Sequence, residues 1–336
     1  MAVGLDLAKN IFQVHGVAED GKVAFNCALR RSQVLGFFRD LDPCLIGMEA
    51  CSSSHYRARE LTKLGHDLRL IPAMYVKPYV KRGKSDAIDA EAICEAVTRP
   101  TMRFATIKSG AQQAVPFLHH AQDLIIRQRT QLSNMLRGLL AEFGITLARG
   151  GGHAIKFAKS VADGTQPDLH EAAQDVVVNL SHQLVALHLG VGWYDRRIAL
   201  ETRNDPRVYL LRTSPGIGPV TASAIVATAG SAKQFRNGRE FAAWLGLIPL
   251  NRSGGGKERL GRNSKMGDRY VRRLLVAGMT ARVVQMKRKP ERADPWAEDL
   301  LARKPFRPVT VAMATKAARI AWALLTKNER YQSRAV

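Results

Sequence analysis

The chain has 336 residues, 46% of them hydrophobic, which is enough for a sizeable core and for two domains. That composition excludes an intrinsically disordered chain. The 51 lysines and arginines outnumber the 29 aspartates and glutamates, so the formal net charge is +22 and a polyanionic partner is expected.

The positive charge is concentrated in one part of the chain. Residues 1–100 contain 14 basic and 12 acidic side chains, whereas residues 207–289 contain 17 basic and 3 acidic ones. We therefore expect an acidic site and a basic surface to belong to different parts of the protein.

The cysteines and the apolar runs point to a cytoplasmic protein. Cys27, Cys44, Cys51 and Cys94 show no C-x-x-C spacing and no finger-like histidines, so we predict reduced core residues. No apolar run approaches the roughly 20 residues of a membrane span, and Met1 leads directly into a strand-like segment without a charged leader. We expect no membrane partner and a cytoplasmic, nucleoid-associated location.

Strand and helix signals alternate over the first hundred residues. Helices are predicted from about Ser32, up to about Gly65 and from Asp86, with Ser85 as the N-cap of the last one. Meandering strands followed by strand and helix alternation predict a mixed sheet covered by helices, in the order of the ribonuclease-H-like fold. The strands are predicted at residues 2–8, 11–17, 22–29, 44–49 and 67–71.

Four carboxylates stand where a strand or a helix start would hold them rigidly. Asp6 lies inside one apolar run and Glu49 ends another, while Asp86 and Asp89 are three residues apart and so share a helix face. Clustered carboxylates repel one another unless a cation lies among them, and oxygen-only ligands favour Mg²⁺ or Mn²⁺. The pattern predicts a two-metal phosphodiester site.

A structural explanation competes for part of this set. Acidic residues in the first turn of a helix are favoured by the helix dipole alone, which would account for Asp86 and Asp89 as ordinary capping residues. Asp6 is harder to explain in this way, because a carboxylate inside an apolar strand is costly to bury unpaired.

The middle of the chain contains two heptad-like patterns. One long helix is predicted over residues 117–143, and a second apolar seam follows the glycine-rich break at residues 150–152. The two could pair as an antiparallel hairpin or across a dimer, or be ordinary amphipathic core helices, with Gly190 and Gly192 weakening the second. The seams consist of Leu118, Ala121, Ile125, Leu132, Met135 and Leu139, and of Val177, Leu180, Leu184, Leu187, Val191, Tyr194 and Ile198.

The carboxy-terminal part opens with SPGIGPVTASAIVA. Gly216 and Gly218 before a helix of small residues resemble a helix-hairpin-helix element, whose amides can receive a phosphate. A cluster of basic residues follows in PLNRSGGGKERLGRNSKMGDRYVRRLL. We predict nucleic-acid contacts from Arg252, Lys257, Arg259, Arg262, Lys265, Arg269, Arg272 and Arg273.

Ser253 is the candidate nucleophile of this segment. It precedes three glycines, which allow a backbone to approach a ligand closely, and it could attack a phosphodiester to form a covalent phosphoserine. No histidine lies nearby in the sequence to act as its base. On spacing alone a nucleic-acid-binding loop is the simpler interpretation, and Ser264 is a competing nucleophile.

Several motifs together resemble one known family. GLDLAKNIFQVH, MEACSSSHY, VKPYVKRGKSDAIDAEAI, SPGIGPVTA, GLIPLNRSGGGKERLGRNSKMGDRYVRRLL and KAARIAWALL are similar to motifs of the insertion-sequence one-ten family of DEDD transposases and occur in the same order. The resemblance implies three domains: a RuvC-like domain at 1–112, a coiled-coil region at 113–205 and a mostly helical transposase domain at 206–336.

The resemblance also implies an activity. Asp6, Glu49, Asp86 and Asp89 would form the metal-binding tetrad and Ser253 the nucleophile of a recombinase guided by an element-encoded bridge RNA that pairs with donor and target DNA. Relatives commonly carry a second serine after the first, where this chain has Gly254. A homo-oligomer is expected, a dimer or a tetramer in the synaptic complex. One hypothesis is that one protomer's tetrad serves another's serine.

Three other functions fit parts of the sequence. A metal-dependent junction resolvase would hydrolyse DNA with water, leaving Ser253 as a phosphate contact. An actin-like ATPase or sugar kinase would use GLDLAKN as its phosphate loop, although the basic carboxy-terminal segment disfavours that function. A non-catalytic RNA-binding protein would keep the fold without cleavage.

Overall fold

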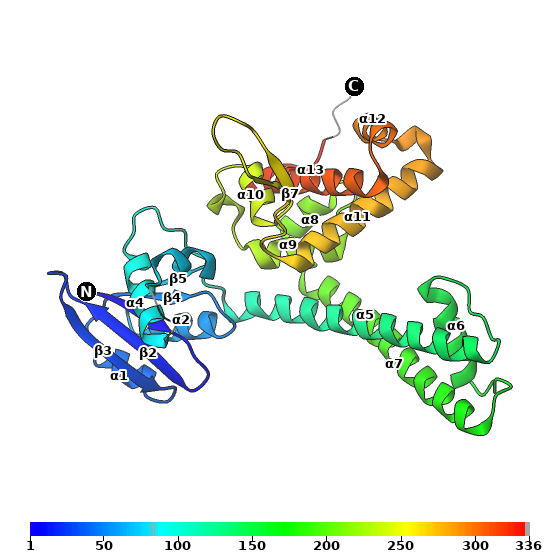
Figure 1. Cartoon of the computed structure of the whole chain (residues 1–336), viewed down its shortest axis with the longest axis horizontal. Helices are drawn as coiled ribbons and strands as arrows, with labels where there is room; N and C mark the ends of the chain where they lie inside the picture. Colours follow the sequence, from blue (N-terminus) through cyan, green and yellow to red (C-terminus); the bar gives the residue numbers. More distant parts are fainter. Residues whose placement is uncertain (82, 84, 333–336) are drawn as a thin grey trace. The chain divides into compact units, whose positions relative to one another are not determined.

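The computed structural model describes residues 1–81, 83 and 85–332, without the side chain of Arg292. It divides into two compact units, Met1–Gln113 and Ala114–Val336, and the last four residues of the second lie outside the described part. Figure 1 shows the elements of each unit. The first unit is a mixed α/β domain, and the second is almost entirely helical.

The first unit is built on one five-stranded sheet in the order β3-β2-β1-β4-β5. The β1–β2 and β2–β3 pairs are antiparallel, whereas β1–β4 and β4–β5 are parallel. Its elements are β1 (Ala2–Asp6), β2 (Ile11–Val17), β3 (Val23–Arg30), α1 (Val34–Arg39), β4 (Leu45–Glu49), α2 (Ser54–Lys63), β5 (Asp67–Ile71), α3 (Ala73–Val76), the 3₁₀ turn η1 (Lys77–Tyr79) and α4 (Asp86–Val97).

The alternation of side chains along β1 separates the two faces of this sheet. Val3 and Leu5 belong to the apolar core that Phe38 of α1 and Leu61 of α2 complete. The opposite face carries Gly4 and meets α4. That packing is tight, because a Cβ added to Gly4 would lie 2.0 Å from the carbonyl oxygen of Ala90.

The second unit begins with three packed helices. Leu136 of α5, Ala158 of α6 and Leu184 of α7 belong to one buried cluster. The sequence predicted no helix where α6 lies, and Gly190 and Gly192 do not interrupt α7. The helices are α5 (Gly110–Glu142), which begins at the boundary between the units, α6 (Gly151–Ala162) and α7 (Glu171–Glu201).

The apolar seam predicted for the first long helix is not the buried stripe of α5. The side chain of Met135 is 54% exposed, whereas its neighbour Leu136 is fully buried. In the second seam Val177, Leu184 and Val191 are buried as predicted. The buried stripe of α5 is therefore displaced by one residue along the helix, and it consists of His119, Gln122, Ser133, Leu136 and Leu140.

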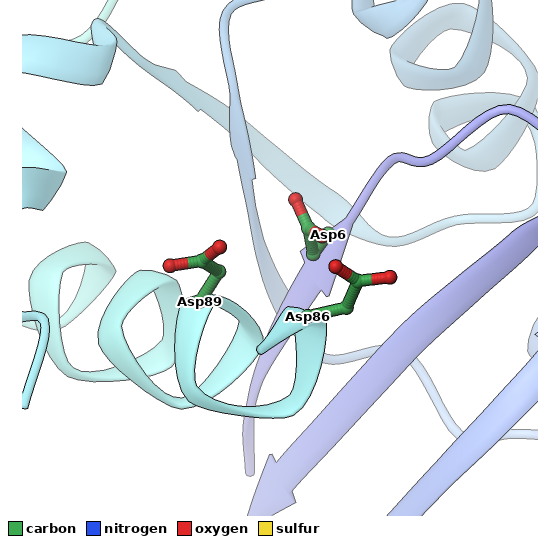
Figure 2. Close-up of side chains that lie close together, drawn as sticks. All are labelled: Asp6, Asp86 and Asp89. Atoms are coloured by element: carbon green, nitrogen blue, oxygen red, sulfur yellow. The ribbon is translucent and has the colours of Figure 1, made fainter. Parts of the chain in front are cut away.

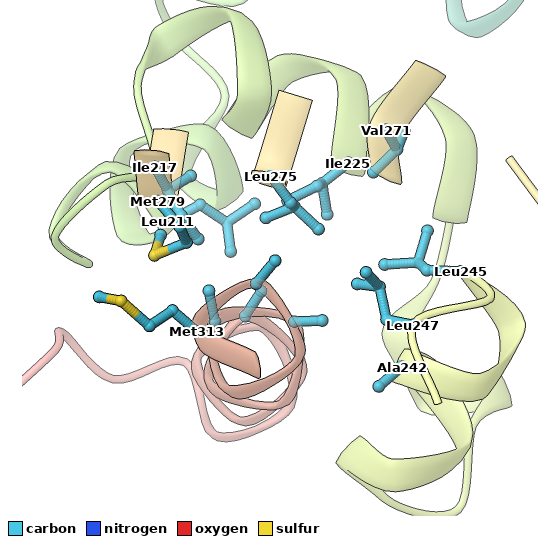
Figure 3. Close-up of a cluster of buried hydrophobic side chains, with 14 of the residues drawn as sticks. Leu211, Ile217, Ile225, Ala242, Leu245, Leu247, Val271, Leu275, Met279 and Met313 are labelled. Carbon is cyan, nitrogen blue, oxygen red and sulfur yellow. The ribbon is translucent and has the colours of Figure 1, made fainter. Parts of the chain in front are cut away.

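The remaining helices surround a larger core, part of which Figure 3 shows. Leu275 and Met279 of α11 pack there with Met313 of α13 and Ile225 of α9. The elements are α8 (Pro206–Arg212), α9 (Pro219–Ala229), η2 (Ala232–Gln234), α10 (Gly238–Trp244), β6 (Pro249–Asn251), β7 (Leu260–Asn263), α11 (Arg269–Arg288), η3 (Pro290–Arg292), α12 (Pro295–Arg303) and α13 (Phe306–Lys327).

Two sequence expectations about apolar residues need correction. Cys44 and Cys94 are buried, but Cys51 is exposed, so it is not a core residue. Among the described helices, α7 and α13 are long and apolar enough to cross a membrane by length and composition. The signal is weak, because α13 owes its apolar small residues, such as Ala314 and Ala318, to the core that they fill.

Candidate metal and nucleic-acid site

The fold brings three of the four predicted carboxylates together. Asp6, Asp86 and Asp89 each offer an oxygen, and these oxygens all lie within 4.8 Å of one another. Figure 2 shows the side chain of Asp6 at the end of β1 close to those of Asp86 and Asp89 on the first turn of α4. Oxygen ligands in such a group suit a hard divalent cation such as Mg²⁺.

A glycine lies two residues before each strand carboxylate, and it allows α4 to pack close to Asp6 and Glu49. Gly4 and Asp6 share one face of β1, and Gly47 and Glu49 share the same face of β4, because side chains alternate along a strand. A Cβ on Gly47 would lie 2.7 Å from the Cβ of Val97, so only a glycine lets α4 lie this close. The Gly-x-acid pattern on both strands is the signal in the sequence for this close packing of α4.

The start of α4 is fixed by a side-chain cap, as predicted. The hydroxyl of Ser85 accepts a hydrogen bond from the amide of Ile88 at 3.4 Å. The cap sets the first turn of the helix, and the three-residue spacing then places Asp86 and Asp89 on one side of it.

The proximity of the three carboxylates changes the pKa of Asp6. Burial, together with the nearby charges of Asp86 and Asp89, raises the pKa of Asp6 from 3.8 to about 6. This repulsion is what a bound cation would relieve.

Glu49 lies at the edge of the cluster. It is outside the group of three whose oxygens approach within 4.8 Å. Burial and the charge of Asp89 raise its pKa, while Lys77 lowers it. Glu49 is therefore coupled to the site without touching its centre.

The predicted serine lies on an exposed hairpin formed by β6 and β7. The amide of Ser253 donates to Asn251 Oδ1 at 2.8 Å, and Ser253 Oγ accepts from the amide of Arg259 at 3.0 Å. Ser264 differs, because its hydroxyl is buried and has no hydrogen-bond partner among the described residues. Of the two serines, Ser253 is the accessible one.

The predicted nucleic-acid contacts divide into exposed and internally engaged residues. Arg272 donates to the carbonyl oxygens of Leu245 and Met266 at 2.9 and 3.1 Å, and Arg273 forms an ion pair with Asp123. Those two arginines brace the fold. Arg273 is nevertheless exposed, as are the remaining predicted contacts Arg252, Lys257, Arg259, Arg262, Lys265 and Arg269.

The two glycines of the predicted helix-hairpin-helix also differ. Gly216, with a φ of +84°, packs against α11, where a Cβ on Gly278 would lie 2.1 Å from the Gly216 carbonyl oxygen. Gly218 is exposed, and a Cβ there would meet nothing within 4 Å. Gly216 thus has a packing role, and only Gly218 remains open to a ligand.

An acidic cluster that could hold a metal ion, in the same chain as a basic helical unit, is typical of proteins that act on nucleic acid. Comparisons with known proteins identify the class of this protein as a transposase. A DEDD transposase model, described as "Transposase", matches residues 3–145, and a model described as "Transposase IS116/IS110/IS902 family" matches residues 208–296.

Relatives match the chain over nearly its whole length. A "Probable family 20 transposase" of Pseudomonas aeruginosa is 47% identical over 331 residues, covering 98% of each chain. The transposase for insertion sequence element IS1328 of Yersinia enterocolitica is 36% identical over 97% of each chain. The transposase for IS1111A of Coxiella burnetii is 34% identical over 98% of this chain and 91% of its own. The chain belongs to the IS116/IS110/IS902 family of transposases.

Proposed function

We propose that this transposase is an RNA-guided recombinase that exchanges DNA strands through a covalent phosphoserine, assisted by divalent metal ions at the acidic cluster. The observation that carries the proposal is the convergence of Asp6, Asp86 and Asp89 within 4.8 Å. Glu49, which lies beside these three residues, would be the fourth member of the tetrad. The chemistry supplied by bound Mg²⁺ or Mn²⁺ would be charge neutralisation at the scissile phosphate and at the leaving oxygen.

The topology of the first unit supports a ribonuclease-H-like, RuvC-like domain. Its strand order β3-β2-β1-β4-β5, with β2 antiparallel to both of its neighbours, agrees with that fold. In this arrangement Asp6 ends the central strand and Glu49 ends the parallel strand beside it. The domain would span residues 1–112, followed by the coiled-coil region at 113–205 and the transposase domain from 206.

The accessibility of Ser253 supports its assignment as the nucleophile. Its hydroxyl would attack the phosphorus, forming an Oγ–P bond while the strand's own P–O bond breaks; the hydroxyl proton is lost and the leaving oxygen takes one up. The exposed side chains of Arg252 and Arg259 flank it and would hold the phosphate oxygens. Ser264, whose hydroxyl is buried, lacks that access.

The partners follow from the same proposal. Donor and target DNA would be selected by pairing with an element-encoded bridge RNA, so the protein itself would read backbones rather than sequence. Exposed apolar side chains on the long helices, among them Phe117, Leu189 and Trp193, support a dimer through this region and a tetramer during exchange. The protein would act in the cytoplasm, on nucleoid DNA.

The decisive experiment tests for the covalent intermediate. The protein, the noncoding RNA that flanks its gene, and nicked donor and target DNA are incubated with Mg²⁺, and any protein–DNA adduct is mapped by mass spectrometry. We expect an adduct on Ser253 that is lost in Ser253→Ala and Asp6→Asn but kept in Ser264→Ala. Cleavage with no adduct would instead identify a water-using junction resolvase and overturn the serine mechanism.

A further inference from the structure

A basic groove crosses the carboxy-terminal part of the second unit. It encloses about 2410 Å³ between α10, α11, α12 and α13 and the base of the β6–β7 hairpin. Asp294 is the one carboxylate among its described lining residues. The cationic side chains that line it are Arg239, Arg262, Lys265, Arg282, Arg307, Lys316 and Arg319.

Most of that positive charge is not neutralised by the protein. Asp294 lies 3.4 Å from Arg282 and 3.5 Å from Lys316, so a single carboxylate serves two cations. The other five cationic residues of the groove form no ion pair within residues 1–81, 83 and 85–332. Like charges gathered in a groove raise the local potential and attract a polyanion.

Aromatic side chains line the groove together with the cationic ones. The indole of Trp296 is 38% exposed, and Lys316 Nζ lies 4.3 Å from its ring centroid. Tyr331 and Trp322 also line the groove, and Trp322 is fixed by a hydrogen bond from its indole nitrogen to the carbonyl oxygen of Phe235. Cations beside fixed aromatic rings are the combination that binds single-stranded nucleic acid, because bases stack on the rings while the backbone follows the charges.

We propose that this groove binds one single strand of nucleic acid and guides it to the hairpin that carries Ser253. Pro249, Arg262 and Lys265 connect the two, since they belong to the hairpin or its continuation and also line the groove. The inference rests on the proposed function, because it assigns a path to the strand on which that serine acts. Bases would stack on Trp296, and Arg307 and Arg319 would bind phosphates.

The charge contribution is tested by the salt dependence of binding in the absence of divalent metal. A fluorescent single-stranded DNA and a single-stranded RNA are titrated with the full chain carrying Arg307→Gln and Arg319→Gln. The matched control, Arg288→Gln with Lys304→Gln, removes the same charge from exposed residues outside the groove. Two lost phosphate contacts should reduce the slope of log K against log salt by about 1.4.

The stacking contribution is tested at Trp296. Trp296→Leu should weaken single-strand binding roughly 5- to 150-fold, the range for one stacked base, whereas Trp296→Phe keeps a stacking face and should retain most of the affinity. A change of slope that is equal in the groove and control variants would overturn the proposal. So would a preference for duplex DNA together with no effect of Trp296→Leu.

The same titrations separate this inference from the proposed chemistry. The binding assay contains no metal and needs no cleavage, so its result does not depend on whether Ser253 is the nucleophile. If no serine adduct forms but the groove variants still bind poorly, the groove stands and the serine mechanism fails. If the adduct forms normally while the groove variants bind like the control, the groove proposal fails alone. Comparing DNA with RNA shows which strand occupies it.

Discussion

The buried imidazole of His119 makes the stability of the second unit depend on pH. Its Nδ1 lies 3.1 Å from the Tyr270 hydroxyl and its Nε2 lies 2.9 Å from Ser223 Oγ. The Tyr270 hydroxyl donates to Gln122 Oε1 at 3.1 Å, so it can only accept from His119. His119 therefore carries a proton on Nδ1, and in the neutral imidazole Nε2 accepts a hydrogen bond from Ser223 Oγ.

The size of the effect follows from the shift in pKa. Burial, and to a smaller extent repulsion from His120, lowers the pKa of His119 from 6.5 to about 4. The unfolded chain takes up this proton below pH 6.5, whereas the folded chain does not until about pH 4. Stability is therefore lost as the pH falls through that window. Between pH 7 and pH 5 the loss is about 2 kcal/mol of unfolding free energy.

Urea denaturation at the two pH values measures this loss. All four tryptophans, Trp193, Trp244, Trp296 and Trp322, lie in the second unit, so their fluorescence reports its unfolding. The decrease in unfolding free energy from pH 7 to pH 5 should be about 2 kcal/mol smaller in His119→Gln than in the unmodified chain. His182→Gln, at an exposed histidine of α7, is the control. An equal pH response in the His119 variant and the unmodified chain would refute the reasoning.

Three further expectations concern the metal site, the backbone and assembly. Asp6→Asn should weaken Mn²⁺ binding measured by calorimetry and abolish metal-dependent DNA cleavage, because it removes a charged ligand from the cluster. Gly267→Ala should destabilise the chain by about 2 kcal/mol or more in thermal unfolding, because φ is +84° and the new Cβ would lie 1.8 Å from the Trp244 carbonyl oxygen. The control is Gly218→Ala, which should be nearly neutral because the space around that Cβ is open. Leu189→Glu, which places a charge on an exposed apolar part of α7, should shift the sedimentation coefficient towards the monomer if that surface forms the dimer.

The carboxylate cluster could be predicted because its residues obey local rules. A strand end, a helix cap and a three-residue spacing each fix a direction, and Asp6, Asp86 and Asp89 need nothing else to converge. Glu49 was harder to place, since its distance from the centre depends on how the parallel strand β4 lies in register with β1. That register places Leu5 opposite Met48, a pairing that no local pattern specifies.

The helix α6 shows why the second unit was predicted less well. Three consecutive glycines disfavour a helix, so residues 150–152 read as a break. In the structure Gly151 begins the helix, because Ala154 and Ala158 can pack into the cluster with Leu136 and Leu184. Burial of an apolar face outweighs the weak local preference, and that burial depends on helices far away in the sequence.

The division of charge between the units sets an order of events at the acidic site. The negative charges of Asp6, Asp86 and Asp89 repel phosphate, and their mutual repulsion adds to burial in raising the pKa of Asp6. The first hundred residues supply almost no excess positive charge to offset it, whereas residues 207–289 carry a large excess. Nucleic acid should therefore bind first to the basic unit, independently of metal, and approach the carboxylates only when divalent cations have reversed their charge. On this reasoning Mg²⁺ changes the rate of cleavage far more than the affinity for DNA.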